Sequence, residues 1–298
     1  MLKCIYCLSS LEKKENRYIC QNCGRAYSTE DGISSFLNKK HQESHFPKNS
    51  FDRLYKNEND NFWFLVRNII IGTTIQHYLP LKSRLIEVGC GTGFVSKHLK
   101  GLGYQVECAD LYLEGLKYSQ KRNAGNAYYQ FNLYDPLFVE EFDGVCAFDV
   151  LEHIDDDRLA LKNMYKGLKP GGFLLLTVPA CKKLWSNTDE LAEHKRRYSA
   201  KELKEKVEST GFKILKLSYF MTFLFPFIAF SRMFANFLSL HRKSETIKSK
   251  TQVFNEIEIN PVLNSLFYLI FRIEAQFIPY LDFRFGSSLL LVAIKRRD

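Results

Sequence analysis

A glycine-rich turn stands out in residues 85–94, whose sequence is LIEVGCGTGF. An apolar strand that enters such a turn and leaves as a helix lets the backbone lie close to a ligand, because glycine has no Cβ to collide. The carboxylate of Glu87 at the strand end disfavours a phosphate and favours a cationic or zwitterionic ligand. A second acid, Asp110, follows the next predicted strand, where a carboxylate can accept both hydroxyls of a ribose. The two acids predict a nucleoside that carries an amino-acid tail.

Two later segments complete a family pattern. Residues 142–153 (FDGVCAFDVLEH) and 168–176 (LKPGGFLLL) follow the two acids along the chain. Together with residues 85–94 and Asp110 they resemble the class I S-adenosylmethionine (SAM) methyltransferases, over about half of the chain. Within that class, the core resembles the ubiquinone-type O-methyltransferases. The alternative is a nicotinamide-binding or inactive nucleotide-binding fold.

The resemblance implies a cofactor role for each matching residue. Glu87 and the glycines would hold the methionine part of SAM, Asp110 the ribose, and Leu111 would pack on the adenine. Asn132 stands where related enzymes have an Asp facing the adenine amino group, and its side-chain oxygen preserves an acceptor there. The expected cofactor-binding residues are Glu87, Gly89, Cys90, Gly91, Gly93, Asp110, Leu111, Asn132 and Asp149.

Two histidines are candidates for the general base. His153 lies in a Leu-Glu-His element, and an imidazole can accept a hydroxyl proton near neutral pH. His194, in the cluster 194–198 (HKRRY), is an alternative base, and Arg196 or Arg197 could bind an anionic substrate. The structural alternative is that these residues only brace their loops. Arg67, in a predicted helix, is a candidate for contact with the SAM carboxylate.

Four cysteines near the N-terminus have metal-ligand spacing. Cys4 and Cys7 form one CxxC pair, and Cys20 and Cys23 form the other. Four thiolates bind Zn²⁺ tetrahedrally, and so short a unit buries too little apolar surface to fold without it. The segment also resembles the zinc ribbon fused to some methyltransferases. We expect structural zinc, with disulfides or free thiols as the alternatives.

The strand and helix pattern predicts an α/β, Rossmann-like fold with a seven-stranded, mostly parallel sheet. Residues 82–180 alternate strands and helices, which is typical of a parallel sheet with ligands at the strand C-terminal ends. Residues 287–294 would add an antiparallel strand. The predicted strands are 84–88, 105–109, 127–131, 143–149, 172–178, 212–218 and 287–294, and the predicted helical segments are 51–79, 92–101, 112–122, 156–167 and 199–211.

The expected domain organisation has five parts. They are a separate zinc ribbon (1–38), a linker and helical lid (39–80), the SAM-binding core (81–218), a Phe-rich helical insertion (219–285), and the last strand with the tail (286–298).

The Phe-rich insertion is apolar over 219–230 and is followed by basic residues. The apolar stretch is too short to span a bilayer and holds Pro226. A helical hairpin that covers a lipid-like substrate or lies in a membrane interface fits this mix, with peripheral membrane contact through 219–250. A helical cap with its own core, or a dimer interface, is the alternative.

Composition bounds the partners and the compartment. The 298 residues carry a net charge of +9 with a pI of about 9.0, which favours nucleic acid or an anionic membrane as partner. Isolated cysteines and the absence of a signal-peptide pattern suggest a reducing cytoplasm.

The function expected is O-methylation of a small-molecule, glycan or lipid-linked acceptor. The alternative is an rRNA or tRNA methyltransferase that grips phosphates through the ribbon. Against it, the strand near 149 leads into Asp-Val-Leu-Glu rather than the Asn/Asp-Pro-Pro-Tyr element of base-amino methylases. A non-enzymatic docking protein is a third hypothesis.

Overall fold

The fold is described from a computed structural model, for residues 1–37, 50–223, 225 and 259–297. The predicted linker and most of the Phe-rich insertion lie outside these residues. The strands are β1 (Leu11–Lys14), β2 (Arg17–Cys20), β3 (Ala26–Glu30), β4 (Ile33–Ser35), β5 (Arg84–Val88), β6 (Gln105–Asp110), β7 (Ala127–Gln130), β8 (Phe142–Phe148), β9 (Leu168–Pro179), β10 (Phe212–Phe220) and β11 (Ser288–Lys295). The α-helices are α1 (Ser50–Asn57), α2 (Phe62–Tyr78), α3 (Phe94–Gly101), α4 (Leu113–Lys121), α5 (Asp157–Gly167), α6 (Asn187–Leu191), α7 (Ala200–Glu208) and α10 (Pro261–Phe277).

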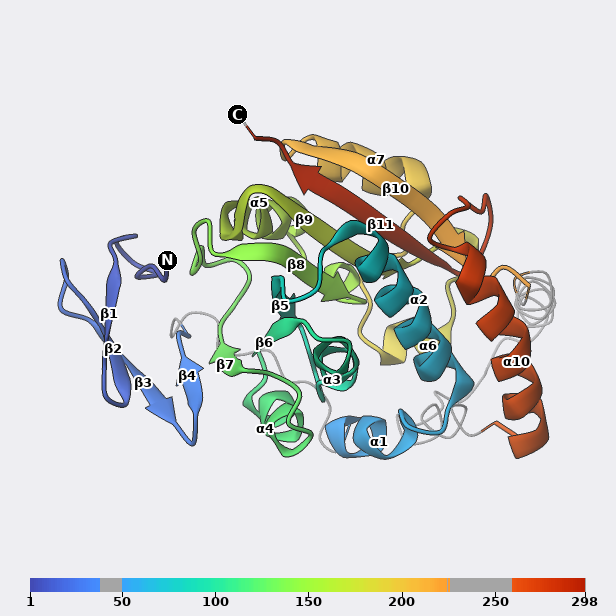
Figure 1. Ribbon diagram of the computed structural model, residues 1–298, viewed down its shortest axis with the longest axis horizontal. Coiled ribbons are helices and arrows are strands. Elements are labelled where there is room, and N and C mark those ends of the chain that lie inside the picture. The colour runs from blue at the N-terminus through green and yellow to red at the C-terminus, as the bar shows by residue number, and fades with distance from the viewer. Residues whose placement is uncertain (38–49, 224, 226–258, 298) are drawn as a thin grey trace, which may run out of the picture.

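All these strands form one sheet in the order β1-β2-β3-β4-β7-β6-β5-β8-β9-β11-β10 (Figure 1). The strands from β7 to β9 pair in parallel, whereas β11 runs antiparallel between β9 and β10. The seven strands outside the ribbon confirm the predicted Rossmann-like core with its antiparallel last strand. Because β5, β6, β7 and β8 are parallel, their C-terminal ends share one edge of the sheet, where α/β proteins bind ligands.

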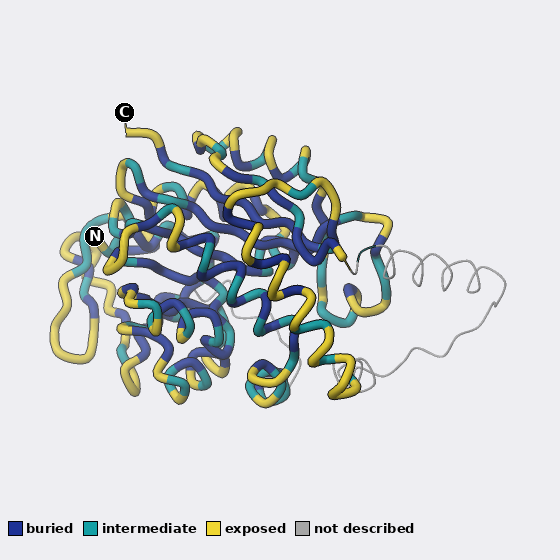
Figure 2. Tube along the Cα trace, turned by 45° about the vertical axis from the view of Figure 1, so that its right-hand side comes forward, coloured by how far each residue is buried: buried dark blue, intermediate teal, exposed yellow. Residues whose placement is uncertain are grey.

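Helices cover both faces of the core sheet. On one face, α2 and α3 bury Ile71, Ile75 and Leu99 against β5 and β6. On the other, α5 and α7 bury Leu161 and Leu203 against β8 and β9. The strands are buried and the outer helix turns are exposed (Figure 2). Strands buried on both faces need apolar residues at successive positions, and β5, β8 and β9 have that composition.

The N-terminal cysteine-rich segment, which we expected to be a separate unit, is joined to the core sheet. Strand β4 pairs in parallel with β7, with Ile33 opposite Tyr128. Phe36 is fully buried, and its ring centroid lies 5.1 Å from that of Tyr27 in the ribbon. The same ring packs against Tyr129 of β7. These aromatic contacts bury apolar area that the short ribbon could not bury alone.

The predicted helical segment 51–79 is two helices. The first ends at Asn57 and the second begins at Phe62. The side chain of Asn61 accepts a hydrogen bond from the backbone N–H of Trp63 at 2.9 Å, which makes Asn61 the N-cap of α2. The break lets α1 pack against α4 while α2 packs against α3.

The C-terminal helix α10 packs along α2 at the edge of the molecule (Figure 1). Phe62 of α2 contacts Phe267 and Phe271 of α10, with ring centroids 5.3 and 5.8 Å apart. The opposite side of α10 is exposed and apolar, and includes Leu266, Leu269 and Ile273. Among the described residues, no helix has the length and apolarity needed to cross a membrane.

Candidate functional site

The glycine-rich turn joins β5 to α3 with three left-handed glycines. A Cβ on Gly89 would lie 2.5 Å from a methyl carbon of Val150, so only glycine fits there. A Cβ on Gly91, by contrast, would meet nothing closer than a ring carbon of Phe51 at 3.9 Å. Cys90 is buried within the turn. The turn is therefore too crowded for a side chain at Gly89, whereas at Gly91 the Phe51 ring lies at ordinary van der Waals distance.

Asp110 lies at the C-terminal end of β6, beside the turn. One oxygen of its carboxylate accepts the N–H of Gly91 and the other accepts the N–H of Tyr112, each at 2.8 Å. Burial raises the pKa of Asp110 to about 6. Each carboxylate oxygen has a second lone pair, so Asp110 can still accept hydrogen bonds from ligand hydroxyls.

Glu87 lies within β5 and is almost fully buried. Ser96 of α3 donates a hydrogen bond to its carboxylate. Burial raises the pKa of Glu87 to about 8. The site therefore holds an acid that a cationic ligand would bring into its charged form.

Arg67, the candidate for contact with the SAM carboxylate, is engaged in an ion pair. Arg67 of α2 forms a salt bridge with Asp149, which follows β8 directly. The guanidinium also lies over the ring of Trp63, 4.7 Å from its centroid. The arginine thus lies beside the predicted site, with Asp149 as its partner.

Two other predicted cofactor contacts, Leu111 and Asn132, have local backbone roles. Asn132 accepts the N–H of Tyr134 at 3.0 Å through its side-chain oxygen, which forms a turn after β7. The carbonyl of Leu111 accepts a hydrogen bond from the side chain of Gln130 at 3.0 Å. That glutamine in turn accepts from Ser35 of β4 at 3.0 Å, so the ribbon is linked to the Leu111 loop.

The sequence analysis did not predict a hydrogen-bond network that joins the segment between α1 and α2 to the glycine-rich turn. The carboxylate of Glu58 accepts from Thr92 of the turn at 2.5 Å and from Arg122 at 2.7 Å. Arg122 also donates to Thr92 at 3.0 Å. The signal is weak in sequence, because these residues are separated by thirty or more positions and only Thr92 belongs to the family motif.

The two candidate bases come together although they are 41 residues apart. The ring centroids of His153 and His194 lie 4.8 Å from each other in an edge-to-face arrangement. Burial and the charge of His194 lower the pKa of His153 to about 4. His153 is therefore neutral near pH 7 and carries a free nitrogen lone pair.

Two buried acids surround this pair, and neither was among the predicted site residues. Asp189 accepts from His194 Nδ1 at 2.9 Å and from Arg197 Nε at 2.6 Å. Although burial opposes ionisation, these bonds lower the pKa of Asp189 to about 2. Glu152 is fully buried, and its Oε1 lies 3.9 Å from His194 Nε2. Burial raises the pKa of Glu152 well above its usual range.

The arginines predicted to bind an anionic substrate have internal partners. Arg197 is buried and bonds Asp189 and the carbonyl of Ala180. Arg196 bonds Asp157 at 3.0 Å. The loop is thus clamped by its own charges, and the internal bonds of the buried Arg197 guanidinium favour the loop-bracing alternative for this residue.

The four N-terminal cysteines converge as predicted. The Sγ atoms of Cys7 and Cys20 are 3.3 Å apart, those of Cys4 and Cys23 are 3.7 Å apart, and all four lie within 4.8 Å of one another. Thiolates around one Zn²⁺ at about 2.3 Å are separated by about 3.7 Å, so this cluster could hold a zinc ion.

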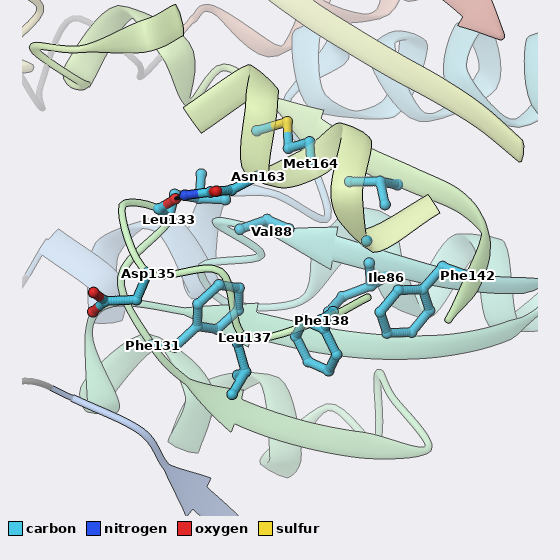
Figure 3. Close-up of a pocket in the computed structure, with 12 residues that line it drawn as sticks. Ile86, Val88, Phe131, Leu133, Asp135, Leu137, Phe138, Phe142, Asn163 and Met164 are labelled. Atoms are coloured by element: carbon cyan, nitrogen blue, oxygen red, sulfur yellow. Dashed lines mark hydrogen bonds between the residues drawn. The ribbon is translucent and has the colours of Figure 1, made fainter. Parts of the chain in front are cut away.

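A small cavity lies in the core (Figure 3). It is lined mainly by apolar side chains of β5, the segment 131–142 and α5, among them Ile86, Phe138 and Met164. Asn163 at its rim donates to the carbonyls of Leu133 and Tyr134. None of the predicted cofactor-binding residues lines this cavity.

Comparison with known proteins places this arrangement in a family. The family described as "Methyltransferase domain" matches residues 64–217, and the chain belongs to it. This confirms the predicted class I SAM-dependent methyltransferase family and its α/β fold.

Two curated relatives match the core. An O-methyltransferase of Aspergillus sclerotiorum is 30% identical over 148 residues, which cover 45% of this chain and 56% of that protein. A ubiquinone biosynthesis O-methyltransferase of Xanthomonas axonopodis is 32% identical over 104 residues, covering 33% of this chain and 44% of the relative. The chain spans about half the length of the curated relatives it matches.

Solved structures share the fold at low sequence identity. A phosphoethanolamine N-methyltransferase of Haemonchus contortus aligns with a TM-score of 0.54 and 15% identity, over 86% of this chain and 59% of that one. The [4+2]-cyclase SpnF aligns with a TM-score of 0.51 and 16% identity, over 79% and 83%. Since one of these proteins is named a cyclase, the reaction must be argued from the site.

Proposed function

We propose that this protein transfers a methyl group from SAM to a hydroxyl oxygen of a small-molecule, glycan or lipid-linked acceptor. The observation that carries the proposal is that two different sites share one edge of the sheet. The glycine turn with Glu87 and Asp110 follows β5 and β6, and the pair His153 and His194 lies by the segment after β8.

The first site fits SAM in its chemistry. Bound SAM would supply an electrophilic methyl group on a sulfonium sulfur. Glu87 would face the cationic amino-acid end, and Asp110 would accept the ribose hydroxyls. A Cβ on Gly91 would meet only the Phe51 ring, at 3.9 Å, so the backbone there is less crowded than at Gly89.

The second site suits a hydroxyl acceptor. An acceptor oxygen must be aligned with the methyl carbon and must lose its proton. Two groups could accept that proton. They are the neutral imidazole of His153 and the imidazole of His194, which Asp189 orients. The relatives named O-methyltransferases support oxygen as the methylated atom.

The exposed side of α10 favours a lipid-linked acceptor on an anionic membrane. Leu266, Leu269 and Ile273 are exposed along the helix, and Arg272 and Arg284 are exposed beside them. Asp282 is paired with Lys216, and Glu274 is buried. An apolar helix face with exposed cations at its border is typical of a surface that lies in the interface of an anionic bilayer.

Vesicle co-sedimentation tests the membrane part of the proposal. The full chain should sediment with vesicles of anionic phospholipid, and the variant Leu269→Asp/Ile273→Asp should stay in the supernatant. Leu81→Asp, at an exposed leucine outside α10, is the matched control and should still sediment. Equal sedimentation of all three proteins would remove α10 as the membrane surface.

Methyl transfer from labelled SAM tests the reaction itself. Label should enter the lipid or glycan fraction of a cell extract, and Asp110→Ala should abolish that incorporation. Label found in the RNA fraction instead would support the alternative rRNA or tRNA methyltransferase. A folded protein that binds no SAM would overturn the proposal.

A further inference from the structure

Three neighbouring strands end together at the ligand-binding edge of the sheet. Ser35 is the last residue of β4, Gln130 is the last of β7, and Asp110 is the last of β6. Ser35 is the register partner of Gln130, and Gln130 is the register partner of Asp110. Because the three strands are parallel, these residues form one row at the edge where α/β proteins bind ligands. The N-terminal ribbon therefore contributes a strand end in the same row as the acid that we assign to the ribose.

The side chain of Gln130 connects the ribbon to the loop after Asp110. Its Oε1 accepts a hydrogen bond from the Ser35 hydroxyl at 3.0 Å, and its Nε2 donates to the Leu111 carbonyl at 3.0 Å. A side-chain amide accepts only through its oxygen and donates only through its nitrogen, so the two partners together fix its orientation. The backbone carbonyl of Gln130 also accepts the N–H of Phe36 at 2.7 Å. The ribbon thus holds Gln130 by its main chain and by its side chain.

The bond from Gln130 continues the sheet where its ladder stops. The pairing of β6 with β7 ends at Asp110 and Gln130, and Leu111 lies one residue beyond it. The carboxylate of Asp110 accepts the N–H of Tyr112 at 2.8 Å, so its position depends on the path of the chain through Leu111. Gln130 therefore holds the backbone on which the geometry of the ribose acid depends.

The ribbon also contacts helix α4, into which this loop leads. Gln120 of α4 donates to the carbonyl of Asp31 at 2.7 Å. Asp31 and Gly32 join β3 to β4 with left-handed backbones at both positions, as a type I′ hairpin turn requires. A Cβ on Gly32 would lie 3.2 Å from Nε2 of Gln120, so glycine allows the helix to approach closely. The ribbon thus holds the segment 111–120 at both of its ends.

We infer that Ser35 and Gln130 are positioning residues for the adenosine part of SAM, which makes the ribbon a part of the cofactor site. The inference rests on the proposed function, in which Asp110 accepts the ribose hydroxyls and Leu111 packs on the adenine. A loop that is already ordered before the ligand arrives does not lose conformational entropy on binding, so affinity is higher. Ser35 orients Gln130, and Gln130 orders the loop.

Loss of one of these side-chain hydrogen bonds should leave the ribbon in its place. Ile33 remains paired with Tyr128, and Phe36 remains buried with its ring against those of Tyr27 and Tyr129. Substitutions at Ser35 and Gln130 can therefore separate cofactor affinity from folding.

Isothermal titration calorimetry of the full chain with SAM tests the inference. Gln130→Met keeps the length of the side chain and removes its hydrogen bonds, so it should weaken SAM binding by about 3- to 10-fold. Ser35→Ala should also weaken binding, whereas Ser35→Thr, which keeps the hydroxyl, should bind like the wild type. Gln105→Met, at the exposed first residue of β6, is the matched control and should leave the affinity unchanged.

Two further titrations distinguish positioning from a general loss of stability. Ser35→Ala/Gln130→Met should bind SAM as Gln130→Met does, because both residues act through one contact. The probe 5′-methylthioadenosine has the adenosine of SAM without its amino-acid end, and its affinity should fall by the same factor. The amino-acid end has a separate support, since Ser96 donates to Glu87. Each titration is made well below the melting temperature of the variant.

The outcomes decide between the possibilities. Unchanged SAM affinity in folded Gln130→Met overturns the inference, and so does an equal loss in Gln105→Met. A loss for SAM that 5′-methylthioadenosine does not share also overturns it, because the effect then lies at the amino-acid end. If Gln130→Met does not fold, Ser35→Ala compared with Ser35→Thr decides by the same criteria. These failures leave the proposed function standing when the wild type binds SAM, whereas a folded wild type that binds no SAM overturns both.

Discussion

Arg67 and Asp149 form a salt bridge that fastens the lid helix α2 to the end of β8. Their side chains are 11% and 20% exposed, so the pair is largely shielded from water. Asp149 has a left-handed backbone (φ 57°) and leads directly into the turn that carries Glu152 and His153. The lid and the candidate catalytic turn are therefore mechanically connected.

Removal of Arg67 should cost more stability than removal of an exposed arginine. Arg67→Ala leaves a shielded carboxylate without its partner and should lower the free energy of unfolding by about 2 kcal/mol. Arg272→Ala is the exposed control and should change it by less than about 0.5 kcal/mol. Chemical denaturation measures both, and a double-mutant cycle with Asp149→Ala should show coupling. Additive effects would mean that the pair contributes nothing.

Asp110→Ala should weaken SAM binding by about 10- to 100-fold, because hydrogen bonds to a charged group contribute about 1.5–3 kcal/mol. Isothermal titration calorimetry measures the change. Glu114→Ala, an exposed acid four residues along, is the control and should bind like the wild type. Unchanged affinity in Asp110→Ala would place the ribose elsewhere.

SAM binding should release a proton from Glu87. The pKa of about 8 means that Glu87 is mostly protonated near pH 6.5 in the free protein. A cationic ligand favours the ionised form and lowers this pKa, so a proton leaves on binding below pH 8 and none leaves near pH 9. Calorimetry in buffers of different ionisation enthalpy gives the proton count.

The Glu87→Gln variant isolates this proton from those of other groups. The wild type should release up to one proton more than the variant near pH 6.5, and the two should match near pH 9. Identical proton counts at both pH values would show that Glu87 does not face the cationic part of the ligand.

Zinc removal should destabilise the whole protein. We expect one zinc per chain, bound by the four cysteine thiolates, and Cys20→Ser should lose it. Because β4 belongs to the core sheet, the thermal midpoint should fall by several degrees, at about 2–4 °C per kcal/mol. Cys181→Ser, outside the cluster, is the control. A zinc-free protein with an unchanged melting temperature would argue against a structural ion.

The core and its glycine turn could be predicted from sequence because each depends on a local pattern. Strand β5 and the turn at Gly89 are encoded within ten residues, and the apolar runs of β8 and β9 show that both their faces are buried. The contact between His153 and His194 was harder to predict from sequence, because it depends on how the loop after β9 folds back.

Three features could not be predicted because they arise from packing between distant segments. The contact between Glu58 and Arg122, the pairing of β4 with β7, and the burial of Glu152 have no local signature. The sequence of a motif does not show whether an acid within it is buried or exposed. Only the packing of the surrounding helices determines this.

The pairing of β4 with β7 also determines which strand lies at this edge of the sheet. Strand β7 would otherwise be the open margin of the core, with a row of unpaired N–H and C=O groups ready to template another chain. The ribbon pairs with β7, so the edge strand at this end of the sheet is β1. This strand has four residues and carries Glu12, Lys13 and Lys14. Short, charged edge strands resist intermolecular strand addition, so at this end of the sheet the N-terminal segment replaces an edge at β7 with one that is less suited to pairing.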